Sequence, residues 1–121
     1  MPARRPDPDG EVSVAAVAAA LDSGDEPERA VVRSAARFLL HELERVRPGR
    51  SVEVRVVPVA AVQAVEGPRH TRGTPPNVVE TDPVTWFKLA TGRIGWDEAV
   101  RTGVVRASGA RSDLSAYLPL T

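Results

Sequence analysis

Residues 77–109 constrain the fold more than any other stretch, because residue type marks nearly every structural boundary within it. A short apolar run, Val78–Val79, predicts a strand. The strand is followed by Asp82 and Pro83, which predict the start of a helix, because Asp caps helix N-termini and Pro fits the first helical position. Apolar and aromatic residues follow, and this helix is expected to end near Gly92.

A second short helix is predicted from Trp96 to Thr102, with two acidic residues in its first turn and Gly103 just past its end. Val104–Ala107 then predicts a returning strand that closes at a Ser-Gly pair. The whole stretch is a strand, helix, turn, helix, strand unit. Because two helices separate its strands, we expect those strands to be parallel or related by a crossover.

This pattern resembles the C-terminal half of the sterol carrier protein family. The matching pieces are TDPVTWFKLATGRI, WDEAVRTG and VVRASG, followed by SDLSAYLPL, and they extend from about Asn77 to Leu120. The sequence looks most similar to a small actinobacterial branch of that family, related to the C-terminal domain of mycothiol-dependent maleylpyruvate isomerases. The resemblance implies an α+β, sterol-carrier-like fold, with a small mixed sheet of four to five strands and helices packed on one face.

The N-terminal third is expected to be helical, after a proline-rich, disordered tail at residues 1–10. Apolar residues at helical spacing predict a short amphipathic helix over Glu11–Leu21. A longer helix follows, with Asp25 or Glu26 as its expected cap, and it runs to about Val46. This helix has one broad apolar stripe, which is typical of packing against a core.

The hydrophobic period changes after this helix, which predicts strands. Valines alternate with charged residues over Ser51–Val57, as in a half-buried strand. Val59–Glu66 fits either an antiparallel partner strand or a short helix at Ala60–Val65, since its alanines favour helices. A fifth strand would have to form near Arg69–Arg72. The chain is expected to end with a helical turn over Ser112–Tyr117, with the first residue as its cap.

Composition limits the classes of function. The 121 residues fit one domain, which we assign to residues 11–121. The 16 basic and 16 acidic residues balance, so no basic excess indicates nucleic acid or an anionic membrane as partner. No cysteine is present, which excludes disulfides and thiolate chemistry, and no apolar segment is long enough for a signal or a membrane span. We therefore expect a soluble, cytoplasmic protein without integral membrane association.

Large apolar residues in the second half form the first candidate site. They could line a cavity between helices and sheet, because an apolar ligand needs a concave, mostly hydrophobic site with few polar groups. The same residues equally suit an ordinary core, in which the two tryptophans would leave little space. The candidates are Trp86, Phe87, Leu89, Ile94, Trp96, Val100, Leu114, Tyr117 and Leu118.

A polar loop over residues 67–77 forms the second candidate site. It places the imidazole of His70, the guanidinium of Arg72 and the amide of Asn77 close together in sequence. Arg72 could pair with a carboxylate or phosphate, and His70 could donate a proton near neutral pH. The alternative is a solvated loop whose side chains bond their own backbone.

Other candidates for chemistry are weak. His41 and Glu44 have a spacing that can hold a metal, but the sequence offers no third ligand, so a solvated helix face is the better interpretation. Asp82, Asp97 and Glu98 are interpreted as helix caps and first-turn acids. No phosphate loop, nucleophile elbow, zinc motif or dinucleotide fingerprint is present, so we expect neither a cofactor nor catalysis.

The resemblance implies a non-enzymatic carrier or binding domain for a small hydrophobic or amphipathic molecule, such as a lipid or fatty acyl compound. An alternative is a stand-alone accessory or protein-interaction module with a filled core and no ligand. A third, weaker hypothesis is a small enzyme that uses the His70–Arg72 loop. Interior volume beside Trp86 and Trp96 should separate the first two, because a carrier needs space and an accessory module does not.

Overall fold

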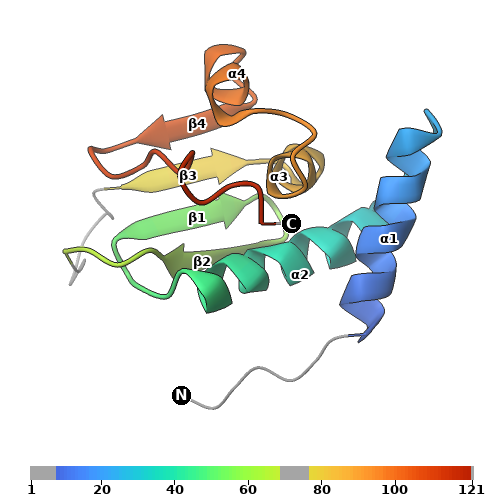
Figure 1. Ribbon diagram of the computed structural model, residues 1–121, viewed down its shortest axis with the longest axis horizontal. Helices are drawn as coiled ribbons and strands as arrows, with labels where there is room; N and C mark the ends of the chain where they lie inside the picture. Colours follow the sequence, from blue (N-terminus) through green and yellow to red (C-terminus); the bar gives the residue numbers. More distant parts are fainter. Residues whose placement is uncertain (1–7, 69–76, 121) are drawn as a thin grey trace.

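The computed structural model describes residues 8–68 and 77–120. Four helices and four strands form the α+β arrangement that the sequence predicts (Figure 1). In chain order the elements are α1 (Pro8–Asp22), α2 (Arg29–Val46), β1 (Val52–Val56), β2 (Ala60–Ala64), β3 (Val78–Thr81), α3 (Pro83–Ala90), α4 (Trp96–Arg101) and β4 (Val105–Ser108).

The four strands form one mixed sheet in the order β2-β1-β3-β4. β1 pairs with β2 antiparallel and with β3 parallel, and β3 pairs with β4 antiparallel. The expectation that the strands flanking residues 82–103 are parallel was therefore wrong. Thr81, the last residue of β3, pairs with Val105, the first residue of β4. The short helices α3 and α4 thus return the chain to the end of the sheet that it left, instead of crossing its length as a parallel connection must.

One face of the sheet is apolar and the other is polar. Val52, Val54 and Val56 of β1 are buried, and their neighbours on the same face include Val62 and Val79. The opposite face presents charged residues, among them Glu53 and Arg55 of β1, whose side chains form an ion pair, and Glu80 and Arg106 of the paired strands β3 and β4. Helices and the C-terminal segment cover the apolar face, so the domain has two layers.

The centre of the core lies between α2, α3 and the sheet. Leu39, Leu40 and Leu43 of α2 are almost completely buried, as are Trp86 and Phe87 of α3. The indole Nε1 of Trp86 donates a hydrogen bond of 3.1 Å to the backbone oxygen of Ala36 in α2. A buried indole N–H needs such a partner, so Trp86 has a structural role at the contact between α2 and α3.

The predicted start of α3 is confirmed. Asp82 caps the helix: its Oδ1 accepts a hydrogen bond of 2.9 Å from the backbone N–H of Thr85, and its Oδ2 accepts one of 2.7 Å from the Thr85 hydroxyl. Pro83 occupies the first turn. Gly92 and Gly103 follow the ends of α3 and α4 with φ of 78° and 81°, in the left-handed region that glycine tolerates best.

The N-terminal helices differ from the prediction at their starts. α1 begins at Pro8, so residues 8–10 are helical and only residues 1–7 of the expected tail lie outside the described part of the chain. α2 begins at Arg29, and neither Asp25 nor Glu26 caps it. The backbone N–H of Asp25 instead donates a hydrogen bond of 2.8 Å to the oxygen of Ala20, so Asp25 belongs to the end of α1.

Strand pairing resolves the ambiguity at residues 59–66. Ala60–Ala64 is β2, and Val62 pairs with Val54 of β1 across the antiparallel hairpin. The segment in which a fifth strand would have to form, Arg69–Arg72, lies outside the described residues. Among the helices of the described part, none is long and apolar enough to cross a membrane.

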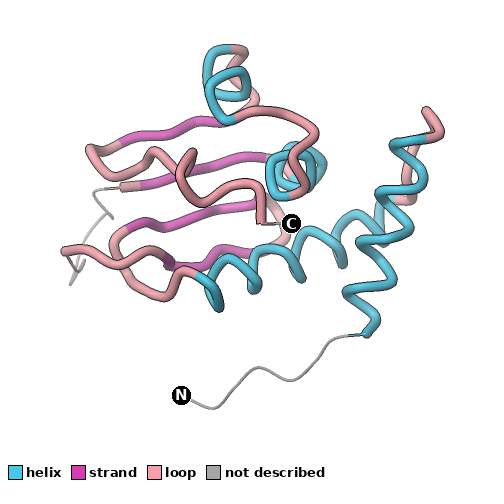
Figure 2. Tube along the Cα trace, viewed as in Figure 1, coloured by secondary structure: helices cyan, strands magenta, loops and turns pink. Residues whose placement is uncertain are grey.

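The predicted helical turn at Ser112–Tyr117 does not form as a helix. The Ser112 hydroxyl donates a hydrogen bond of 2.8 Å to the oxygen of Gly109, which closes the turn after β4 instead of starting a helix. A single turn forms over Leu114–Tyr117, where the backbone N–H of Tyr117 donates a hydrogen bond of 2.9 Å to the oxygen of Leu114. The backbone N–H of Ser115 donates to Oδ1 of Asp113 at 2.8 Å, and the remaining segment is irregular (Figure 2).

Candidate functional site

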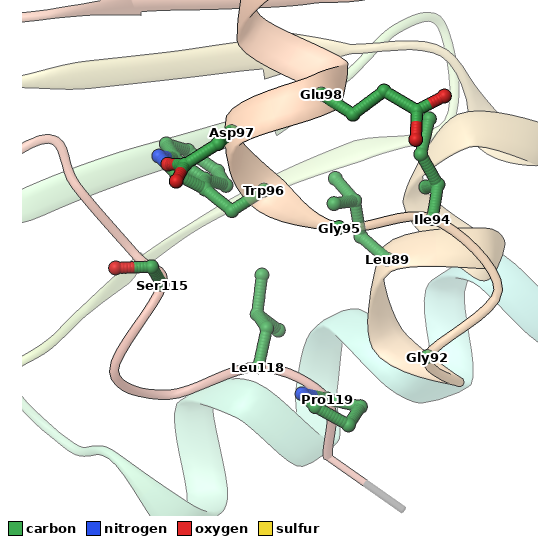
Figure 3. Close-up of a pocket in the computed structure, with 10 residues that line it drawn as sticks. All are labelled: Leu89, Gly92, Ile94, Gly95, Trp96, Asp97, Glu98, Ser115, Leu118 and Pro119. Carbon is green, nitrogen blue, oxygen red and sulfur yellow. The ribbon is translucent and has the colours of Figure 1, made fainter.

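A hollow of about 360 Å³ lies between the end of α3, the start of α4 and the C-terminal segment (Figure 3). We call it the apolar groove. Its apolar walls are Leu89, Ile94, Trp96, Leu118 and Pro119. Leu118 points toward the space between Trp96 and Leu89 in Figure 3, so side chains from three separate segments converge there. Such convergence of apolar groups on a concave surface is what a small hydrophobic ligand requires.

The turn between α3 and α4 positions two of these walls. α3 ends at Ala90, and Gly92 allows the chain to reverse before Ile94 and Trp96. Arg93 fixes the turn from outside: its Nη2 lies 3.0 Å from Oδ1 of Asp22 at the end of α1, and its guanidinium lies 5.5 Å from the centre of the Phe87 ring. Ile94 and Trp96 are both half-buried, so each contacts the core and still faces the groove.

The mouth of the groove is acidic. Asp97 and Glu98, in the first turn of α4, line it together with Ser115, and both acidic residues are exposed. Figure 3 shows the two carboxylates on opposite sides of α4. No lysine or arginine is among the described residues that line the groove. The site therefore disfavours an anionic head group and suits a neutral or cationic polar end.

The C-terminal segment is held in place at several points. Leu114 is fully buried, and the backbone N–H of Leu120 donates a hydrogen bond of 2.8 Å to the oxygen of Ala90, the last residue of α3. Hydrogen bonds from the Ser115 hydroxyl and amide hold the pKa of Asp113 below its usual range. These contacts make the segment a fixed wall of the groove rather than a loose tail.

The nine apolar residues that the sequence singled out fall into three groups. Leu89, Ile94, Trp96 and Leu118 line the groove. A second group of Trp86, Phe87 and Leu114 is buried core. The last group faces elsewhere: the Tyr117 ring lies 5.1 Å from the guanidinium carbon of Arg47, and Val100 is 39% exposed on α4.

Sequence reasoning missed part of the lining. Pro119, Gly92 and Gly95 line the groove as backbone or ring surface, and Asp97 and Glu98 were expected only as first-turn acids of α4. The C-terminal segment is neither helix nor strand, so it has no periodic pattern that marks which of its residues face the groove.

Of the three polar candidates, Asn77 lies within the described residues. Asn77 is buried, and its amide donates a hydrogen bond of 2.8 Å to the oxygen of Ser51 and accepts one of 2.9 Å from the backbone N–H of Arg111. Asn77 therefore connects the start of β3 to β1 and to the segment after β4. His70 and Arg72 lie outside the described residues.

The remaining candidate, His41 with Glu44, is a close pair on α2. His41 Nδ1 lies 3.4 Å from Oε1 of Glu44. Within residues 8–68 and 77–120, no group of three or more His, Cys, Asp or Glu side chains could hold a metal ion. Both His41 and Glu44 are half-buried.

A comparison with protein families bears on this architecture. A family model described as "Bacterial SCP ortholog" matches residues 28–120. The chain belongs to this family. The match begins at Glu28, the residue before α2, and includes the whole sheet and every residue of the groove. α1 precedes the matched region. A comparison of this SCP ortholog with curated proteins found no match.

Proposed function

We propose that this SCP ortholog is a non-enzymatic carrier for a small apolar molecule without an anionic group, bound in the apolar groove. The observation that supports this most directly is the convergence of Leu89, Trp96 and Leu118 on one hollow. The family supports a carrier-type domain. The proposal includes a cytoplasmic location, as expected from the sequence.

Packing of the core limits where a ligand can lie. Trp86 is 1% exposed and its indole is hydrogen-bonded to α2, so the space beside it is filled with protein. Trp96 is half-buried and borders the groove. We therefore expect the ligand in an open groove beside Trp96, and not in a tunnel beneath Trp86.

The size and charge of the groove limit the class of ligand. A volume of about 360 Å³ is at the small end of ligand sites in proteins. The carboxylates of Asp97 and Glu98 at the mouth would repel a fatty-acid carboxylate or a phosphate. A neutral aliphatic or alicyclic alcohol, ester or hydrocarbon of modest length fits both limits.

The test uses the full chain and two probes of equal length, 1-octanol and octanoate. Binding of 1-octanol near Trp96 should change the tryptophan fluorescence, while Trp86 remains shielded in the core. Replacing Leu118 with Ser should weaken binding about tenfold, since it removes a buried hydrophobic contact and adds a hydroxyl. Val100→Ser is the matched control, because Val100 lies on α4 but does not line the groove.

Two results would overturn the proposal. Equal loss of 1-octanol binding in both variants would place the probe outside the groove. A complete lack of binding, together with no apolar compound in native mass spectra of the purified protein, would favour the accessory-module hypothesis instead.

A further inference from the structure

A second hollow, of about 370 Å³, lies at the opposite end of α3 from the groove. It is formed by the start of α2, the turn between β1 and β2, and the first residues of α3. None of its lining residues also lines the apolar groove. We call it the arginine cavity, because Arg29 and Arg33 line it. It is therefore a separate site with its own chemistry.

The floor of the arginine cavity is apolar and rigid. Its apolar lining consists of Pro27, Val32, Pro58, Pro83 and Val84. Val32 is 5% exposed and belongs to the core, so the floor continues into the packed interior. Three of the five are prolines, whose rings have fixed φ and lose little side-chain entropy when buried. The shape is thus preformed, which lowers the entropic cost of binding.

Two guanidinium groups border this apolar floor. Arg29 and Arg33 of α2 are four residues apart, on one face of the helix, and both line the cavity. Neither forms an ion pair or a side-chain hydrogen bond within residues 8–68 and 77–120. One carboxylate, that of Glu26, also lines the cavity, so the charge of the lining is net positive.

The position of these arginines is unfavourable for α2 itself. Like charges four residues apart repel each other, and Arg37 extends the same row by another turn. Arg29, in the first turn, also opposes the helix dipole, and the acidic residue nearest to it at this helix end is the N-cap Glu28. Glu26 and Glu28 lie near the pair in sequence but form no ion pair with either arginine, so both guanidinium groups are available to an external anion.

We propose that the arginine cavity binds a small amphiphilic anion. Its apolar group contacts Val32, Pro58 and Val84, and its carboxylate or phosphate accepts hydrogen bonds from Arg29 and Arg33. Guanidinium groups suit both acids, because they present paired donors to two oxygens. The opposite charge of the two hollows means that one chain would select a neutral ligand in the groove and an anion in this cavity.

Binding is measured by isothermal titration calorimetry on the full chain with octanoate, octyl phosphate and 1-octanol. The two anions should bind at the arginine cavity, and their relative affinities identify whether a carboxylate or a phosphate is preferred. Arg33→Gln should weaken anion binding about tenfold, as expected for the loss of a charged hydrogen bond. Glu26→Gln should strengthen it by a smaller factor, because a repelling carboxylate is removed.

Arg37→Gln is the matched control. It removes the same charge from the same row of α2, but Arg37 does not line the cavity, so anion affinity should change less than about twofold. Circular dichroism of each variant establishes that it is folded. Equal weakening by Arg33→Gln and Arg37→Gln would indicate nonspecific attraction to the helix surface and overturn the proposal, as would undetectable binding of both anions.

The groove variant Leu118→Ser separates this inference from the proposed carrier function. It should weaken 1-octanol binding and leave anion binding unchanged, because Leu118 does not line the arginine cavity. Loss of anion binding in Leu118→Ser would place both probes in the groove and refute a second site. Failure of the groove to bind 1-octanol would leave the anion result intact.

Discussion

Replacing Gly49 with alanine should destabilise the domain more than its half-buried position in the connection between α2 and β1 indicates. Gly49 has φ of 154°, and an added Cβ would lie 2.1 Å from the backbone oxygen of Val65 and 2.5 Å from the backbone nitrogen of Glu66. Side-chain carbons essentially never approach other atoms within 3.0 Å. The segment after β2 would therefore have to move by nearly 1 Å, and because these are backbone atoms, no side-chain rotation can relieve the contact.

The size of the destabilisation depends on the hydrogen bonds of Val65 that this movement would weaken. Its N–H donates a hydrogen bond of 2.7 Å to the oxygen of Arg47, and its oxygen accepts bonds from the N–H and the hydroxyl of Ser51 at 3.2 and 2.7 Å. Val65 itself has φ of 69°, a strained conformation for a β-branched residue, so these bonds maintain it. Weakening them costs about 1 kcal/mol each. The positive φ of Gly49 adds about 1–2 kcal/mol, for a total of about 4–5 kcal/mol.

Gly24→Ala is the control for this experiment. Gly24 also has positive φ, 77°, but an added Cβ would meet nothing within 4 Å. The expected loss of stability in Gly24→Ala is therefore only the cost of a positive φ for alanine, about 1–2 kcal/mol. Urea denaturation of both variants gives the free energies of unfolding, with equal m-values if only the native state is affected. Equal destabilisation of the two variants would refute the steric argument for Gly49.

Two further predictions concern Asp82 and Asp113. Asp82→Ala should lower the free energy of unfolding by about 1 kcal/mol, because it removes the cap of α3, and Asp25→Ala, which removes no cap, should have little effect in the same urea titration. Because hydrogen bonds from Ser115 lower the pKa of Asp113 in the folded state, the carboxylate stabilises the fold above the pKa of the unfolded chain, and this stabilisation is lost as the pH falls through the lower folded pKa. Asp113→Asn should therefore reduce the change in melting temperature between pH 5 and pH 2, and an unchanged pH profile would show that these hydrogen bonds do not contribute.

The elements with local signals were predictable from sequence, and those that depend on distant pairing were not. Asp82 and Pro83 define the start of α3 through contacts within four residues. Ala60–Ala64 has no comparable signal, and pairing with β1 decides that it is a strand. The direction of β4 was mispredicted for the same reason. It depends on the end of the sheet to which α3 and α4 return the chain, and the residues of β4 do not encode this.

In the candidate site, too, local features were predictable and features that depend on distant neighbours were not. Sequence reasoning placed Trp86 and Trp96 in one apolar cluster, because both are among the large apolar residues of the second half of the chain. Their positions relative to α2 separate them: Trp86 contacts the backbone of Ala36 and is buried, whereas Trp96 is one helix further along and remains half-buried. Exposure of this kind depends on which neighbour covers each residue, and a single sequence does not contain that information. The arginine cavity was missed because its walls come from three segments far apart in the sequence.

The anchoring of Leu120 to Ala90 has a practical consequence for preparing the protein. An affinity tag fused after the last residue would emerge beside Leu118 and Pro119, two walls of the groove. Its side chains would be present there at millimolar effective concentration and would compete with weak probes. Screens for ligands of the groove should therefore use a tag that precedes Pro8, at the end of α1 away from Asp22.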